Sequence, residues 1–211
     1  MNRFLVTLLA VSVLVGADIP RKPTTEKWEG PWVRGLFGSL KTTIYYGPWK
    51  CSQQFMNECE ARCRSEERKL MGCMWLADIK FDGQGHVPIL GLEAKTGTRY
   101  AMTHCCCDYI PIATELGNAR RKQWDRYRSS FRERWAKNMG EWPSDKTGDR
   151  KGVPWDAHHG HDIGRGGNPT DGSKIFPVPP DIHDVFDRQY PLCYAGAAGW
   201  NQVGPDRPYR D

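Results

Sequence analysis

Long hydrophobic runs are scarce in this chain of 211 residues. The most extended apolar run, from Phe4 to Val15, is shorter than the roughly 20 residues that span a bilayer as a helix. Arg3 precedes it and small residues up to Ala17 follow it, which is the pattern of a cleavable secretory signal. We therefore interpret residues 1–17 as a signal peptide and predict a secreted or periplasmic protein. A plain apolar N-terminal helix is the alternative interpretation.

Other features are missing as well, and each absence narrows the class of protein. No cysteine lies near the expected cleavage site, so a lipid-anchored protein is not indicated and we expect no stable membrane anchor. Internal repeats and low-complexity tracts are absent, which argues against a repeat protein or a disordered one. With 26% charged residues and a net charge of +5 at pH 7, the composition is that of a globular protein with one domain or two small ones.

Cysteine, in contrast, is well represented and unevenly placed. Seven of the eight cysteines lie before residue 110, and Cys193 stands alone near the C-terminus. Because thiols outside the cytosol tend to oxidise, an exported chain with an even number of cysteines predicts a disulfide framework. The sequence leaves the individual pairs open. The alternative is a zinc site using Cys59, Cys63 and part of the His104–Cys107 run, although the spacing matches no standard zinc pattern.

Residues 18–110 are predicted to form a disulfide-rich α+β unit. Residues 21–32 are rich in proline, threonine and charge and indicate an exposed lead-in. A helix is expected over residues 52–69, which places Cys59 and Cys63 on one face. Nothing in this unit indicates catalysis. The predicted strands cover residues 42–46, 86–94 and 98–104.

Residues 111–150 are predicted to hold a basic helix followed by a linker. Between residues 119 and 137 the chain has eight Lys or Arg against two acids, and aromatic residues recur every three or four positions. This pattern predicts an amphipathic helix with an aromatic face that packs on the core. If the opposite, basic face lies beside a catalytic site, it would hold a polyanion. The aromatic residues are Trp124, Tyr127, Phe131 and Trp135.

Three of the six histidines fall within four positions, at His158, His159 and His161. Neighbouring residues in a strand point to opposite sides, so one member of the His158-His159 pair can face a metal and the other an attacking water. Gly166-Gly167 then permits a tight loop. His86 and His104 have no partners in the sequence, and we interpret both as structural.

A second short strand is predicted at residues 174–178, followed by a helix that begins after Pro179-Pro180 with Asp181 as its cap. His183 and Asp187 are four residues apart and therefore share one face of that helix. The C-terminal part, residues 151–211, is thus expected to fold as strand, loop, strand and helix, with imidazoles and a carboxylate converging.

This arrangement resembles the HNH, or ββα-metal, nuclease motif of colicin-type DNases and of nuclease domains in bacterial polymorphic toxins. In that family a His pair is followed by Gly-Gly, by an Asn, by a metal-binding His and often by a further ligand one helical turn on. Here those positions hold His158-His159, Gly166-Gly167, Lys174, His183 and Asp187. The resemblance implies an α+β protein in which the disulfide-rich N-terminal unit precedes a ββα-metal (His-Me finger) nuclease domain.

Two residues depart from the family pattern. Lys174 stands in place of the Asn, and a lysine cannot accept the hydrogen bonds with which that Asn braces the loop. Asp187 stands where a third imidazole is frequent, which is chemically acceptable because carboxylates bind the same cations. The resemblance implies that the general base is His159, that Asp156 orients a ligand or a nearby Arg, and that one divalent metal ion, Mg²⁺, Mn²⁺ or Zn²⁺, is held by His158, His183 and Asp187.

The activity that the resemblance implies is metal-dependent hydrolysis of phosphodiester bonds in DNA, with RNA less favoured. The biological role then divides between an exported bacterial toxin with a cognate immunity protein and a secreted nutrient-scavenging nuclease. Because of Lys174, a non-catalytic envelope or nucleic-acid-binding protein with a degenerate site is a third alternative. Contacts to the phosphate backbone, blind to base sequence, are expected from Lys174, Arg165, His161, Arg120, Arg121 and Arg126; a solvated loop histidine is the equal alternative for His161.

Overall fold

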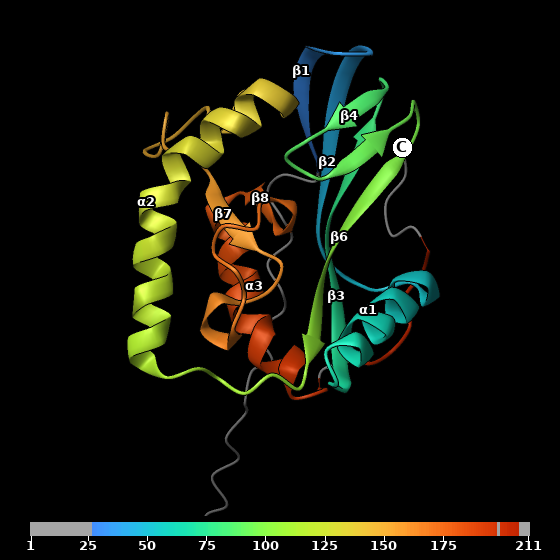
Figure 1. The fold of residues 1–211 in the computed structure, drawn as a ribbon, viewed down its shortest axis with the longest axis vertical. Coiled ribbons are helices and arrows are strands. Elements are labelled where there is room, and N and C mark those ends of the chain that lie inside the picture. Colours follow the sequence, from blue (N-terminus) through green and yellow to red (C-terminus); the bar gives the residue numbers. More distant parts are fainter. Residues whose placement is uncertain (1–26, 198, 207–211) are drawn as a thin grey trace, which may run out of the picture.

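The computed structural model describes residues 27–197 and 199–206, so the predicted signal peptide lies outside the described residues. The chain is an α+β protein built on a four-stranded antiparallel sheet in the order β1-β2-β3-β6 (Figure 1). These strands are β1 Lys27–Gly35, β2 Gly38–Lys50, β3 Leu70–Phe81 and β6 Arg99–Cys107. A small hairpin of β4 Gly85–Val87 and β5 Leu92–Ala94 lies between β3 and β6 in the sequence.

Residues 27–32 of the predicted lead-in are mostly exposed, as expected, but they form the first part of strand β1. Among the described strands, β1 pairs only with β2. Its register shifts between Glu29 and Trp32, where the sequence reads Gly-Pro. Proline is tolerated on an edge strand and at a bulge, so a segment with loop-like composition forms a strand once β2 is beside it.

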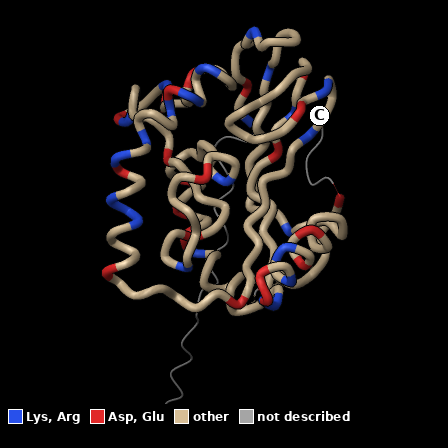
Figure 2. The backbone as a smooth tube through the Cα atoms, in the orientation of Figure 1, with Lys and Arg blue, Asp and Glu red and all other residues tan. Residues whose placement is uncertain are grey.

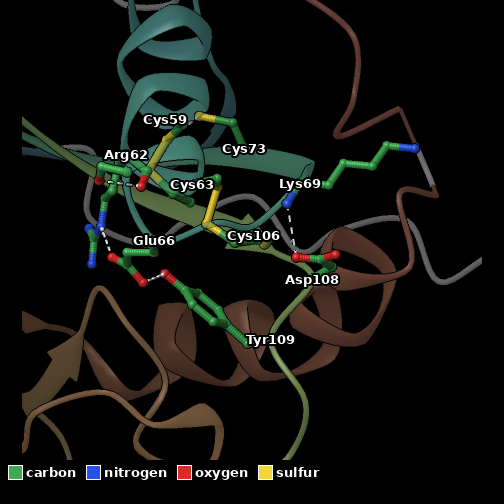
Figure 3. The surroundings of a disulfide bond; sticks show 12 residues. Cys59, Arg62, Cys63, Glu66, Lys69, Cys73, Cys106, Asp108 and Tyr109 are labelled. Carbon is green, nitrogen blue, oxygen red and sulfur yellow. Dashed lines mark hydrogen bonds and ion pairs between the residues drawn. A yellow bond between two sulfur atoms is a disulfide. The ribbon is translucent and has the colours of Figure 1, made fainter.

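Helix α1 (Gln53–Ser65) confirms the helix expected in the N-terminal unit, with Cys59 and Cys63 buried on one face. Both cysteines bond to β6, as Cys59–Cys105 and Cys63–Cys107, and Cys51–Cys73 joins the ends of β2 and β3. Below α1, Glu66 accepts a hydrogen bond from the Tyr109 hydroxyl and pairs with Arg62 (Figure 3). The predicted disulfide framework is confirmed: all eight cysteines are paired, and none is left for a zinc site.

The three consecutive cysteines of β6, residues 105–107, form disulfide bonds on both faces of the sheet. Side chains alternate along a strand, so Cys105 and Cys107 point toward α1 while Cys106 points the other way, to the bond with Cys193 of α3 (Pro180–Tyr194). Helices α1 and α3 accordingly cover opposite faces of the sheet (Figure 1). Most buried apolar side chains of both predicted units belong to one cluster that extends from Leu40 to Trp200.

Helix α2 (Thr114–Met139) is the predicted amphipathic helix, extended by several residues at its start. Its aromatic face packs inward: Phe131 and Trp135 are fully buried, and Trp124 and Tyr127 are partly buried against the core. The rings of Trp124 and Phe131 meet edge to face at 5.8 Å between centroids. Lys and Arg positions recur along this helix (Figure 2), and most of these residues are exposed.

The strand–loop–strand–helix order expected for the C-terminal part is present. Strand β7 (Asp156–His159) pairs antiparallel with β8 (Ile175–Val178), and α3 follows directly. The cap assignment is wrong: Pro179 is the N-cap and Asp181 lies in the first turn, because the two fixed proline φ angles already lead the chain into the helix. No helix in the described ranges is long and apolar enough to cross a membrane.

Candidate functional site

A cleft of about 650 Å³ opens between the first half of α2, strand β7 and helix α3. Each element contributes polar side chains, and the loop after β7 adds more. The cleft contains six of the residues predicted from sequence: Arg121, His158, His159, Arg165, His183 and Asp187. It is also lined by Trp124, Asp125, Asp162, Tyr190 and Tyr194. The chain thus brings together side chains from positions as far apart as Arg121 and Tyr194.

His158 is the most enclosed of these residues, with 2% of its surface exposed. Its ring packs edge to face against Phe176 of β8 and Phe186 of α3, each 5.2 Å away between centroids. The Tyr190 hydroxyl lies 2.8 Å from its Nδ1 and 2.5 Å from its Nε2. Burial, and next the neighbouring His183, holds the pKa of His158 well below its usual range. His158 is therefore neutral and able to act as a ligand near neutral pH.

His159 lies on the other side of β7 and is only partly buried. Its Nε2 is 3.3 Å from the Pro169 carbonyl oxygen. A carbonyl oxygen only accepts, so Nε2 carries the proton and donates it, and in the neutral ring Nδ1 holds the lone pair. Burial lowers the pKa of His159 to about 4. The edge-to-face contact with Trp124, at 4.8 Å between centroids, fixes the ring beside the cleft in the neutral form that a general base needs.

The predicted metal ligands lie on the α3 side of the cleft. His183 and Asp187 share one helical face, with Nδ1 and Oδ2 3.5 Å apart, and the ring centroids of His158 and His183 are 5.5 Å apart. Within residues 27–197 and 199–206, no three His, Cys, Asp or Glu side chains form a ready-made metal-binding group. Two imidazoles and one carboxylate in one cleft are nevertheless the donor types that bind Zn²⁺ or Mn²⁺, so the chemistry of these residues fits a divalent cation.

Arg165 is the best-anchored basic side chain in the cleft. Its Nη1 donates to the Tyr109 carbonyl oxygen at 2.8 Å, and its guanidinium lies 4.1 Å above the centre of the Tyr194 ring. Arg121 of α2 also lines the cleft. A phosphate entering the cleft would therefore meet two positive charges.

Arg120 has a different place, outside the cleft. Its Nη1 donates to the carbonyl oxygens of both Gly166 and Gly167. The pair forms the tight loop predicted for it: Gly166 has a left-handed φ of 97°, and a Cβ on Gly167 would come within 2.1 Å of the His161 carbonyl oxygen. Arg120 therefore braces the loop that follows the histidines. Arg126 lines a separate surface depression beside Gly166.

Three other predicted site residues do not line the cleft. Lys174 borders a small cavity beside Arg62 and β6, and burial lowers its pKa. His161 stacks on Tyr109 with 4.2 Å between centroids and donates from Nε2 to the Arg165 carbonyl oxygen. Asp156 begins β7 opposite Val178, near Arg132. The loop between β7 and β8 is closed without the family's Asn, since Asp171 accepts from the amide of Ser173 and the Lys174 carbonyl accepts from the Gly160 amide.

We predict that Lys174→Asn preserves or raises any activity of the cleft. The loop is already held by Asp171 and by backbone hydrogen bonds, and removing a partly buried ammonium relieves a desolvation cost. Comparing initial rates of plasmid cleavage for the two proteins checks this. A loss of more than about tenfold, roughly 1.4 kcal/mol, would show that the Lys174 ammonium reaches the substrate.

Sequence reasoning missed several residues that shape the cleft, among them Trp124, Tyr190 and His104. Trp124 was expected only to pack on the core. Tyr190 follows Asp187 by three residues on α3, so helical periodicity applied one turn further would have found it. His104 is fully buried, as expected for a structural histidine, but it packs directly on Tyr190, and no local pattern predicts that contact.

The buried His104 is expected to make the free energy of unfolding of this protein depend on pH. Burial, followed by the positive charges nearby, lowers its pKa from 6.5 to about 3. Between these values the unfolded chain takes up a proton that the folded chain does not, so the free energy of unfolding falls as the pH drops from about 6.5 toward 3. We expect His104→Gln to reduce this slope in urea titrations at several pH values. His86→Gln, at an exposed position, is the control; equal slopes in wild type and His104→Gln would contradict the prediction.

Comparison with models of known protein families, with curated proteins and with solved structures finds no match to this chain. The case for function therefore depends on the geometry of the cleft and on the motif in the sequence.

Proposed function

We propose that the protein is an exported, metal-dependent endonuclease that hydrolyses phosphodiester bonds of DNA, with an HNH-type ββα core formed by β7, β8 and α3. The observation that carries the proposal is the single cleft in which His158, His159 and His183 meet Asp187 and are faced by basic side chains. These are the groups that hydrolysis of a phosphate diester requires: a neutral base, ligands for a cation and counter-charges for the substrate.

In the proposed reaction, His159 Nδ1 takes a proton from water as the water oxygen attacks phosphorus. A new phosphorus–oxygen bond forms while the bond to the 3′-oxygen breaks, and that oxygen leaves with a proton from solvent. The Pro169 carbonyl keeps His159 in the tautomer that this transfer needs. Arg121 and Arg165, which both line the cleft, hold the phosphate, and Trp124 limits the movement of the base.

The residues that would hold the cation are His158, His183 and Asp187. When bound, it would stabilise the charge that develops on the phosphate and on the leaving oxygen. Because contacts to the phosphate backbone carry no sequence information, cleavage is expected to be largely independent of base sequence.

The test is incubation of the purified mature chain with supercoiled plasmid in Mg²⁺, Mn²⁺ or Zn²⁺, with EDTA as the control and a single-stranded RNA as a second substrate. Nicked and linear products that EDTA abolishes support the proposal. Binding to plasmid without cleavage in any metal would instead favour the non-catalytic protein with a degenerate site, and cleavage of RNA alone would overturn the choice of DNA.

Two biological roles remain within the nuclease proposal, and expression separates them. A toxin lacking residues 1–17 should kill the producing cell unless a cognate immunity protein is present. A scavenging nuclease should be secreted in bulk and need no protector. The four disulfides are compatible with either role outside the cytosol.

A further inference from the structure

His104 connects the disulfide-rich part of the chain to the cleft. It lies on β6, fully buried, and its ring stacks on that of Tyr190 with 4.3 Å between centroids and 24° between planes. Its Nε2 is 2.9 Å from the Tyr194 hydroxyl oxygen. Tyr190 and Tyr194 are one turn apart on α3, so a single side chain of the sheet supports both tyrosines that line the cleft.

Tyr190 in turn contacts His158. Its hydroxyl lies within hydrogen-bond distance of both ring nitrogens of His158, and the two rings are stacked at 28°. Where the Tyr190 oxygen accepts the N–H of one nitrogen, the other nitrogen of the neutral ring keeps its lone pair for a cation. The orientation of His158 therefore depends on where Tyr190 is held.

A covalent bond fixes the place of that helix. Cys193 lies between Tyr190 and Tyr194 on α3, and it is joined to Cys106, two residues after His104 on β6. The absence of a side chain at Gly72 lets α3 come close to the sheet. Gly72 pairs with Cys106, and a Cβ on Gly72 would come within 2.8 Å of the Cys193 carbonyl oxygen. The bond joins positions 87 residues apart and is the one disulfide that reaches α3.

We propose that β6 completes the cleft, with His104 positioning Tyr190 and Tyr190 positioning His158, and that the site assembles only in a chain whose Cys106 and Cys193 are bonded. The expected effect on catalysis rests on the proposed function. The positioning of Tyr190 and His158 by β6 does not depend on that function. His104 and Tyr190 act as positioning residues. The disulfide-rich unit thereby regulates the cleft of the C-terminal part.

The chemistry of the step is the oxidation of two thiols. Cys106 and Cys193 together give up two electrons and two protons as the S–S bond forms, and a small disulfide such as oxidised glutathione takes them and is reduced to two thiols. Both cysteines are fully buried in the folded chain, so exchange with an external thiolate is blocked once the bond has formed. A chain still in a reducing compartment would lack the bond and the working cleft, whereas an exported chain would keep both.

The decisive variants remove one disulfide at a time from the full mature chain. Cys106→Ala/Cys193→Ala breaks the link to α3. Cys63→Ala/Cys107→Ala is the matched control, because Cys107 is on the same strand but bonds to α1 on the opposite face of the sheet. Tyr190→Phe removes only the hydroxyl, and Tyr100→Phe, on β6 and outside the cleft, is its control.

Two measurements are made on each protein: amide hydrogen exchange of β7 and α3 without metal, and plasmid cleavage with Mn²⁺. We expect the Cys106/Cys193 variant to lose exchange protection in residues 187–194 and to lose cleavage by at least about tenfold, while the Cys63/Cys107 variant keeps both. Tyr190→Phe should keep the protection and lose roughly 10- to 100-fold in activity, as expected when the support of a ligand is removed.

The outcomes separate this inference from the proposed function. If oxidised wild type cleaves no plasmid, the proposed function fails, and exchange protection still decides whether the bond organises α3. Equal loss of protection in both disulfide variants, or no loss in either, overturns the inference. So does full cleavage by a Cys106/Cys193 variant, because a working cleft would then form without the bond. Should that variant prove unfolded by circular dichroism while its control folds, full activity of Tyr190→Phe would overturn the positioning role.

Discussion

His159→Ala is expected to lower the rate of plasmid cleavage by roughly 10²- to 10⁴-fold, the usual contribution of a positioned general base. Burial holds its pKa at about 4, so the imidazole is neutral at neutral pH. Metal affinity should stay close to that of wild type, since the side chain faces Trp124 and the loop, and the proposed ligands lie on α3 and on the opposite side of β7. Single-turnover kinetics and calorimetric titration of Mn²⁺ measure the two quantities separately.

His158→Ala is expected to differ from His159→Ala in its effect on metal affinity. This variant should lose both cleavage and metal affinity, because His158 is the buried member whose ring contacts His183 and α3. His86→Ala, at a remote and exposed histidine, should change neither. Equal loss of metal binding in the His158 and His159 variants would show that the roles within the pair are assigned incorrectly.

Substitution of Asp187 is expected to have the second large effect, on the choice of metal. An anionic oxygen donor favours harder cations such as Mg²⁺ and Mn²⁺, whereas a third imidazole favours Zn²⁺. Asp187→Ala should weaken Mn²⁺ binding by at least about tenfold, and Asp187→His should tighten Zn²⁺ binding. Titration of both metals into the three proteins measures these shifts.

Asp184→Ala is the matched control, because Asp184 is an exposed carboxylate on the same helix that does not line the cleft. The competing interpretation is that Asp187 is a surface carboxylate whose ion pairs are worth only a few tenths of a kcal/mol. Identical Mn²⁺ affinities for wild type, Asp184→Ala and Asp187→Ala would remove Asp187 from the site.

The position of α2 changes how the basic residues of the sequence are understood. Arg120, Arg121 and Arg126 all belong to one charged run, but only Arg121 lines the cleft. Arg120 and Arg126 border a separate surface depression, where Arg120 also braces the glycine loop. The sequence alone therefore shows that the helix is basic. Which of these three arginines lies near the histidines depends on how the helix is rotated against the core.

Periodicity in the sequence determined much of the fold. The repeat of Trp124, Phe131 and Trp135 predicted the buried face of α2, and the order of strand, loop, strand and helix followed from residues 156–187. The even number of cysteines, together with the predicted export, predicted complete pairing. These predictions succeed because each depends on residues that are neighbours along the chain or along one face of an element.

Only the tertiary structure decided which residues meet. The pairing of Cys106 with Cys193 depends on the register of β6 against β3, which sets which cysteines face α1 and which face α3. The contact between His104 and Tyr190 joins residues that no repeat relates. Long-range contacts of this kind are fixed by strand order and by how helices pack on the sheet, and a single sequence records neither. The histidines of the candidate site could be found from their spacing, but the contact of His104 with Tyr190 and the Cys106–Cys193 bond could not.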